Sequence, residues 1–165
     1  MIKGIITAIV MLSLLFTVGC KQIQELRGTS SATTPEVVRT AKLGTDWQMS
    51  QMKFDVEAGG ELSILLELTT GDKVDGYFYL EQGKDFAFDV TGNSLIYETK
   101  QQSTEDSDST ISDRFSFTAT QEQGISYALN FHNTADEDDT QKKITVFLEI
   151  IYPATGSIFV PLKSD

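Results

Sequence analysis

The feature that most constrains the fold is a regular alternation of apolar and polar residues, which begins after Trp47 and recurs along the chain. Every second residue of segment 62–68 is Leu or Ile, and segment 125–131 alternates in the same way. Neighbouring side chains of a strand point to opposite faces, so this pattern predicts strands with one buried side. Segment 144–151 is apolar on both faces and predicts a strand buried on both sides. About eight such segments, separated by Gly or Asn, predict an all-β fold: a single antiparallel β-sandwich of the jelly-roll type.

A different pattern occupies the amino end, where one charge, Lys3, precedes the apolar run 5–18. This length is typical of a secretory signal and is shorter than the roughly 20 residues that span a membrane. The run ends in Gly followed by Cys20, which resembles the lipobox of bacterial lipoprotein signal peptides. Thr17 departs from that family, which usually has Leu at this position.

The lipobox resemblance implies a signal peptide at 1–19 that is removed before Cys20. It also implies a lipid such as palmitate on the Cys20 thiol, and hence a lipoprotein anchored on the extracytoplasmic side of the cell membrane. Two alternatives remain open: a plain cleaved signal and an uncleaved anchor.

Segment 20–46 lacks a regular period and is rich in Ser, Thr, Gln and charged residues. Such a composition is typical of a flexible tether, here between the lipid anchor and a folded domain at 47–165. For residues 36–43 an alternative remains open, in which they pair onto the domain as an edge strand or form a short helix.

The charge balance and the residue counts limit the partners and the chemistry. The chain has 24 Asp and Glu against 13 Lys and Arg, a formal net charge of −11. This argues against nucleic acid, whose phosphates are bound by clustered cations. One Cys and one His exclude a disulfide framework and a Cys/His metal site. The single His, His132, is expected to face solvent at a strand end, and a Ser-His-Asp triad has no support.

Two acidic loops between predicted strands, at 101–113 and 134–141, carry oxygen ligands of the kind that Ca²⁺ takes. A β-sandwich can bring two such loops together at one end, so Ca²⁺ is the cofactor to test. The competing interpretation is that the loops keep the domain soluble. Asp106 and Asp108 have the spacing that begins an EF-hand loop, but the required Gly and closing Glu are missing. The candidate ligands are Glu105, Asp106, Asp108, Asp113, Asp136, Asp138 and Asp139.

Five motifs follow one another in the domain: 54–62, 76–80 with its continuation to 98, 114–119, 124–133 and 143–150. In the fourth motif a Gly, a Tyr, a Phe and an Asn follow one another across ten positions. Together the motifs resemble the GOLD domain, the lumenal β-sandwich of the p24 (emp24-type) cargo proteins. The resemblance implies a sandwich that binds proteins or lipids and has no catalytic residues in its pattern.

The motif residues expected to be structural are Gly124, Tyr127, Phe131 and Asn133. Gly124 can adopt a positive φ in a turn. Tyr127 can bury its ring and bond its hydroxyl at the sandwich edge, as in a tyrosine corner. The chain departs from the p24 pattern at Leu129, where those proteins have a disulfide-forming Cys, and it ends at Asp165 without their coiled coil and membrane span. A cargo-sorting role is therefore not expected.

Tyr77, Tyr79 and Tyr97 lie on or near faces opposite to the predicted core, and Trp47 opens the domain. Exposed, they would stack on sugars or anchor a partner; the favoured alternative is that they pack as a second layer. The expected function is a non-catalytic, membrane-anchored module that binds an envelope protein, a lipid or another ligand. The alternatives are a Ca²⁺-dependent binding module and a carboxylate-based hydrolase or sugar-processing accessory.

Overall fold

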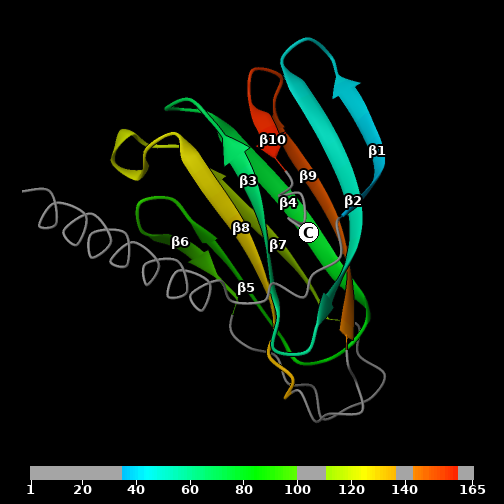
Figure 1. Ribbon diagram of the computed structural model, residues 1–165. Coiled ribbons are helices and arrows are strands. Elements are labelled where there is room, and N and C mark those ends of the chain that lie inside the picture. Colours follow the sequence, from blue (N-terminus) through cyan, green and yellow to red (C-terminus); the bar gives the residue numbers. More distant parts are fainter. Residues whose placement is uncertain (1–34, 100–110, 137–142, 160–165) are drawn as a thin grey trace, which may run out of the picture. The chain divides into compact units, whose positions relative to one another are not determined.

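A computed structural model describes residues 35–99, 111–136 and 143–159, which form two antiparallel β-sheets packed face to face (Figure 1). The predicted all-β sandwich is confirmed. The elements in chain order are β1 (Glu36–Leu43), β2 (Trp47–Glu57), β3 (Glu61–Glu67), β4 (Lys73–Gln82), β5 (Phe86–Thr91), β6 (Leu95–Glu98), β7 (Ser112–Thr118), the 3₁₀ helix η1 (Gln121–Gln123), β8 (Ser126–Asn133), β9 (Lys143–Pro153) and β10 (Ser157–Phe159).

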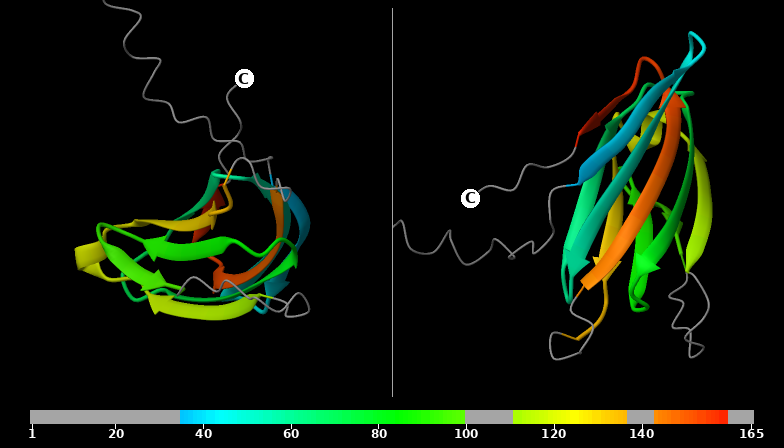
Figure 2. Two further views of the ribbon diagram at one scale, coloured as in Figure 1. Left: turned by 90° about the horizontal axis from the view of Figure 1, so that it is seen from below. Right: turned by 90° about the vertical axis from the view of Figure 1, so that its right-hand side faces the viewer.

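Each sheet has five strands. Sheet A has the order β1-β2-β9-β4-β7, and sheet B has the order β10-β3-β8-β5-β6. All strand pairs are antiparallel. The central strands are therefore β9 in one sheet and β8 in the other, and the left view of Figure 2 shows the sandwich from below.

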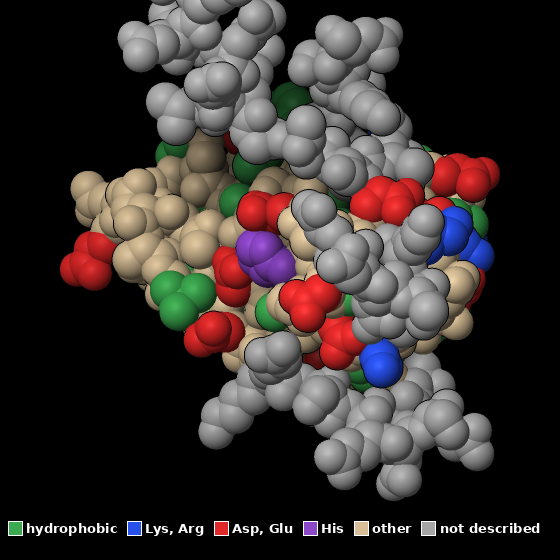
Figure 3. Space-filling model, turned by 60° about the horizontal axis from the view of Figure 1, so that its bottom comes forward, with side chains coloured by type: hydrophobic (Ala, Val, Ile, Leu, Met, Phe, Trp, Pro, Cys, Tyr) green, Lys and Arg blue, Asp and Glu red, His purple; other side chains and the backbone are tan. Residues whose placement is uncertain are grey.

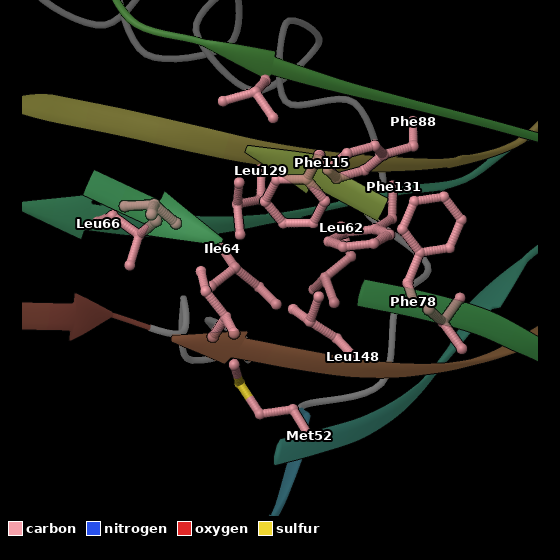
Figure 4. Close-up of a cluster of buried hydrophobic side chains, with 14 of the residues drawn as sticks. Met52, Leu62, Ile64, Leu66, Phe78, Phe88, Phe115, Leu129, Phe131 and Leu148 are labelled. Atoms are coloured by element: carbon pink, nitrogen blue, oxygen red, sulfur yellow. The ribbon is translucent and has the colours of Figure 1, made fainter. Parts of the chain in front are cut away.

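The core consists of the alternate residues that the sequence pattern places on one face of each strand. In β3 the buried positions are Leu62, Ile64 and Leu66. Aromatic rings fill the space opposite them: the ring of Phe131 lies 4.8 Å from Phe88 and 5.0 Å from Phe54, between centroids. Figure 4 shows this cluster between the two layers. Burial of each such side chain stabilises the fold by about 1.5–3 kcal/mol.

The amino-terminal boundary of the domain differs from the sequence prediction. Residues 36–43, expected within a flexible tether, form the edge strand β1 instead. This strand pairs with β2 from Leu43 opposite Trp47 to Glu36 opposite Lys53. The edge-strand alternative is thus the one that the structure has, and the boundary predicted between 46 and 47 falls inside the β1–β2 hairpin.

Eight of the ten strands correspond to predicted segments, and the two others are the edge strands β1 and β10. Nearly all of β1 is exposed, so no alternation marks it, and β10 has only three residues. The strand β9, predicted to be buried on both sides, is the centre of sheet A, with Phe147 and Ile151 half-buried on its outer side. Within the described residues, no helix has the length and apolar character needed to cross a membrane.

Candidate functional site

The motif residue Tyr127 lies at the start of β8, close to the crossing from one sheet to the other. Its side chain is fully buried, and its ring lies 5.3 Å from that of Phe117. Its hydroxyl accepts a hydrogen bond from the backbone N–H of Thr120 at 3.0 Å and lies 3.1 Å from the carbonyl oxygen of Gly124. Gly124 itself has a φ of 80°, as expected for a turn glycine. Both residues therefore fix the crossing from β7 in sheet A to β8 in sheet B.

The motif residue Asn133 connects three segments at the opposite end of β8. It is 2% exposed. Its Nδ2 donates to the carbonyl of Val56 at 2.9 Å, and its Oδ1 accepts from the N–H of Ala135 at 3.1 Å. Phe131, two residues earlier, is fully buried in the aromatic cluster. The four motif residues thus have structural roles in the described domain.

The acidic loops are only partly described. Glu105, Asp106, Asp108, Asp138 and Asp139 lie outside the described residues. Of the other two candidates, Asp136 is exposed. Among the described residues, no group of three or more His, Cys, Asp or Glu side chains is arranged to hold a metal ion.

Asp113, the other described candidate, accepts hydrogen bonds from two groups of the same domain. Its Oδ2 accepts a hydrogen bond from the hydroxyl of Tyr97 at 2.6 Å, and its Oδ1 accepts one from the N–H of Arg114 at 2.7 Å. Burial and the bond to Asp113 raise the pKa of Tyr97 to about 12. The ring of Tyr97 packs on Phe88 and Phe115. Asp113 therefore holds β7 to β6 across the edge of the sandwich.

His132 belongs to a hydrogen-bonded network on the outer face of sheet B. Its Nε2 lies 2.9 Å from Oδ2 of Asp89 on β5, and its Nδ1 lies 3.6 Å from Oε2 of Glu61 on β3. Oδ1 of Asp89 accepts from Nδ2 of Asn130 at 2.7 Å, and Oδ1 of Asn130 accepts from the hydroxyl of Ser63 at 2.7 Å. The single His, purple in Figure 3, stands there among red acidic side chains. It is a third exposed and links three strands rather than simply facing solvent.

The outer face of sheet A carries two of the tyrosines that the sequence singles out, Tyr77 and Tyr79, whereas Tyr97 lies on β6 of sheet B. The rings of Tyr79 and Phe147 stack with centroids 5.0 Å apart, and the rings of Tyr77 and Tyr79 lie 6.0 Å apart. The guanidinium of Arg114 lies 5.3 Å from the centre of the Tyr77 ring. Because these rings contact each other and a cation, Tyr77 and Tyr79 pack as a second layer, which is the favoured alternative, whereas Trp47 is 36% exposed.

Polar side chains complete the same face with ion pairs, one between the neighbouring strands β2 and β9 and one that reaches across β9 from β2 to β4. Lys53 on β2 pairs with Glu81 on β4. Nζ of Lys143 lies 2.6 Å from Oδ2 of Asp55, and Oδ1 of Asp55 accepts from the hydroxyl of Thr145 at 2.7 Å. Burial acts to raise the pKa of Asp55, but the bonds from Lys143 and Thr145 outweigh it and hold the pKa below its usual value. The hydrogen bond to Asp55 raises the pKa of Lys143.

The outer face of sheet B also carries a row of mainly apolar residues that crosses all five strands. Each member is the register partner of the next, from β10 through β3, β8 and β5 to β6. With strands about 4.8 Å apart, the row is roughly 19 Å long. We call it the apolar row, and its residues are Phe159, Leu65, Ala128, Thr91 and Leu95.

Charge is distributed unequally between the two sheets. The strands of sheet A carry six Lys or Arg and seven Asp or Glu. The strands of sheet B, as the structure describes them, carry four acids and no Lys or Arg. Sheet A is therefore nearly neutral, whereas sheet B is acidic. The four acids of sheet B are Glu61, Glu67, Asp89 and Glu98.

Comparison with known families matches residues 51–157 to the model of the emp24/gp25L/p24 family/GOLD. The match runs from β2 to the start of β10 and so includes both sheets. The chain belongs to this GOLD family. The resemblance to the GOLD domain is thereby confirmed, and this family consists of non-enzymatic domains of the cargo-receptor type; the lipobox resemblance is a separate prediction that the match does not test.

Two further comparisons add little. One solved structure similar to the GOLD chain is described as "CBM4 structure and function"; it is 10% identical, the alignment covers 82% of this chain and 81% of that one, and the TM-score is 0.34. That score is too low to support a conclusion about function. A search of curated proteins gave no match.

The apolar row and the network around His132 were not predicted from the sequence. Leu65 and Leu95 read as ordinary members of alternating segments, because the row becomes visible only once the register of four strand pairs is known. One signal was available, since Leu65 stands on the polar side of an otherwise regular strand.

Proposed function

We propose that the protein is a membrane-anchored extracytoplasmic lipoprotein whose GOLD sandwich binds a protein, a lipid or another envelope ligand without catalysing a reaction. The observation that carries the binding role is the family match over both sheets. The side chains considered above as candidates for catalysis or metal binding also support it. Among the described residues, His132 is hydrogen-bonded to Asp89 on β5, and Asp113 is hydrogen-bonded to Tyr97 on β6, so both have structural roles.

The anchor is the second part of the proposal and rests on the amino-terminal sequence. Cys20 follows an apolar run and is the only Cys of the chain. It lies outside the described residues. A diacylated Cys binds a bilayer stably, whereas one acyl chain gives only marginal binding, so two or three chains on Cys20 would hold the domain at the membrane.

The anchor is tested by comparing the wild-type protein with Cys20→Ala in the cells that make it. The wild-type protein should be in the membrane fraction, label with palmitate and carry the added mass of the lipid. The variant should show neither the palmitate label nor the added mass of the lipid. It should either leave the membrane fraction or keep its unprocessed leader. Ser30→Ala, a substitution in the same segment, is the control and should behave as wild type. Equal mass and equal membrane association of wild type and Cys20→Ala would rule out the lipoprotein.

A further inference from the structure

The apolar row on sheet B exposes side chains that do not contribute to the core. Leu65 is 42% exposed, Phe159 47% and Leu95 56%. These residues stand on three different strands, and Ala128 and Thr91 connect them across the sheet. A contiguous exposed apolar strip of this kind is typical of an interaction site, whereas isolated exposed apolar residues need no explanation.

The surface beside the row is held in place by hydrogen bonds. Toward the end of β8 that contains His132, the next position along each strand's outer side gives Ser63, Asn130 and Asp89 in register. These three side chains bond to one another, and Asn130 also reaches the hydroxyl of Thr91 within the row, at 3.3 Å. A partner that covers the row would therefore meet an ordered polar border, with little side-chain entropy left to lose.

Acidic residues surround the row. Glu67 lies at the next outward position of β3 beyond Leu65, and Asp89 and Glu98 lie opposite each other on β5 and β6. No strand of sheet B carries a Lys or Arg within the described residues. The charge of this face thus complements a cationic partner and repels an anionic bilayer surface.

We infer that the outer face of sheet B is the docking surface for a protein segment that is both apolar and basic. Apolar side chains of the partner cover the apolar row, and Lys or Arg side chains reach the carboxylates beside it. This inference rests on the proposed binding function and names the surface and the chemistry of the partner. The outer face of sheet A fits such a segment less well. Leu43 and Trp47 are exposed at its β1–β2 edge, but the charges of its strands are nearly balanced, and its tyrosines and ion pairs contact one another.

The test places a photo-crosslinking amino acid, p-benzoylphenylalanine, at one position of each face in the full-length protein in its own membrane. On sheet B it replaces Leu65. The matched position on sheet A is Ser116, an exposed outward residue of β7. Both sites are on exposed side chains, so both variants should fold, which thermal melting checks. After irradiation, crosslinked segments are identified by mass spectrometry.

The inference predicts crosslinks from position 65, and few from position 116, to a protein segment rich in apolar residues and in Lys or Arg. Adding Glu67→Lys and Glu98→Lys should reduce the yield from position 65 by about fivefold or more, since the attraction to a basic segment is reversed. The double variant Glu36→Lys and Asp75→Lys on sheet A is the charge control and should leave the yield unchanged.

Three results would overturn the inference, and they bear differently on the proposed function. Crosslinks only from position 116 would move the docking surface to sheet A and leave the binding function intact. Crosslinks from position 65 to lipid, or to an acidic or uncharged segment, would contradict the chemistry of the partner. An absence of crosslinks from both positions in abundant, folded, membrane-associated protein would contradict the binding function as well.

Discussion

The outer faces of the two sheets are built from the same kind of alternating strand, yet they use their outward positions differently. On sheet A the outward side chains bond to each other across strands, as the stack of Tyr79 on Phe147 and the pair of Lys143 with Asp55 show. On sheet B the polar side chains form a network, but Leu65 and Leu95 remain exposed beside it. Sheet A also keeps exposed apolar side chains, Leu43 and Trp47 at its β1–β2 edge, but only on sheet B do such side chains lie on strands whose described charges are all acidic. The difference teaches that sheet A's face mainly contributes to the fold, whereas sheet B's face offers a partner an apolar row beside carboxylates.

The largest expected effects lie inside the sandwich, where the two sheets should not differ. Phe131→Ala in the central strand of sheet B should lower the free energy of unfolding by about 3–5 kcal/mol, and Leu148→Ala in the central strand of sheet A by about 2–5 kcal/mol, because each leaves a cavity in the core. Urea denaturation of the purified protein measures both. If only one of them is strongly destabilising, the asymmetry of the sheets extends through the core and is not confined to the outer faces.

Intermediate effects separate the two outer faces directly. Phe147→Ala on sheet A should lower the free energy of unfolding by about 1–2 kcal/mol, because it removes a half-buried ring and its stack with Tyr79. Leu65→Ala on sheet B should change it by less than about 0.5 kcal/mol, because its side chain is exposed. The same denaturation experiment measures both. Equal losses would show that Leu65 is part of the fold and would remove the contrast between the faces.

The smallest effect concerns acid pH on sheet A. Because the folded state holds the pKa of Asp55 below its usual value, its contribution to stability is present above the unfolded pKa of about 3.9 and is lost as pH falls through the folded pKa. Asp55→Asn should cost less than about 1 kcal/mol at neutral pH, and its melting temperature should fall less than that of wild type below about pH 4. Asp136→Asn, at an exposed position, is the control and should follow wild type. Parallel curves for wild type and Asp55→Asn would show that the pair does not stabilise the fold.

The sequence was sufficient for features that repeat with a period of two. The alternation predicts that Leu62, Ile64 and Leu66 share a buried face, and the structure buries all three. The roles expected of Gly124 and Tyr127 likewise depend on residues close by in the sequence, such as the contact of the Tyr127 hydroxyl with the Gly124 carbonyl. The strand β1 was predicted only as an alternative, since an edge strand exposed on nearly all sides has no apolar period to reveal it.

Contacts that depend on the register between distant strands could not be predicted from the sequence. His132 is separated by 43 residues from Asp89, and the alternation of β8 shows only that His132 points away from the core. Likewise, Phe159 and Leu65 are neighbours because β10 returns along β3, a connection that no local pattern encodes. The candidate surface can therefore be recognised only once the strand pairing is known, whereas the core can be predicted from the local alternation of apolar residues.

The position of β1 at the edge of sheet A has a consequence for contacts between copies of the protein. A free edge strand offers unpaired N–H and C=O groups, through which identical molecules can join into open-ended fibres. Here the register with β2 shifts between Val37 and Arg39, so the regular part of the edge is short. Arg39 and Lys42 bring like charges together when two such edges approach. Joining of copies into fibres along this edge is therefore disfavoured.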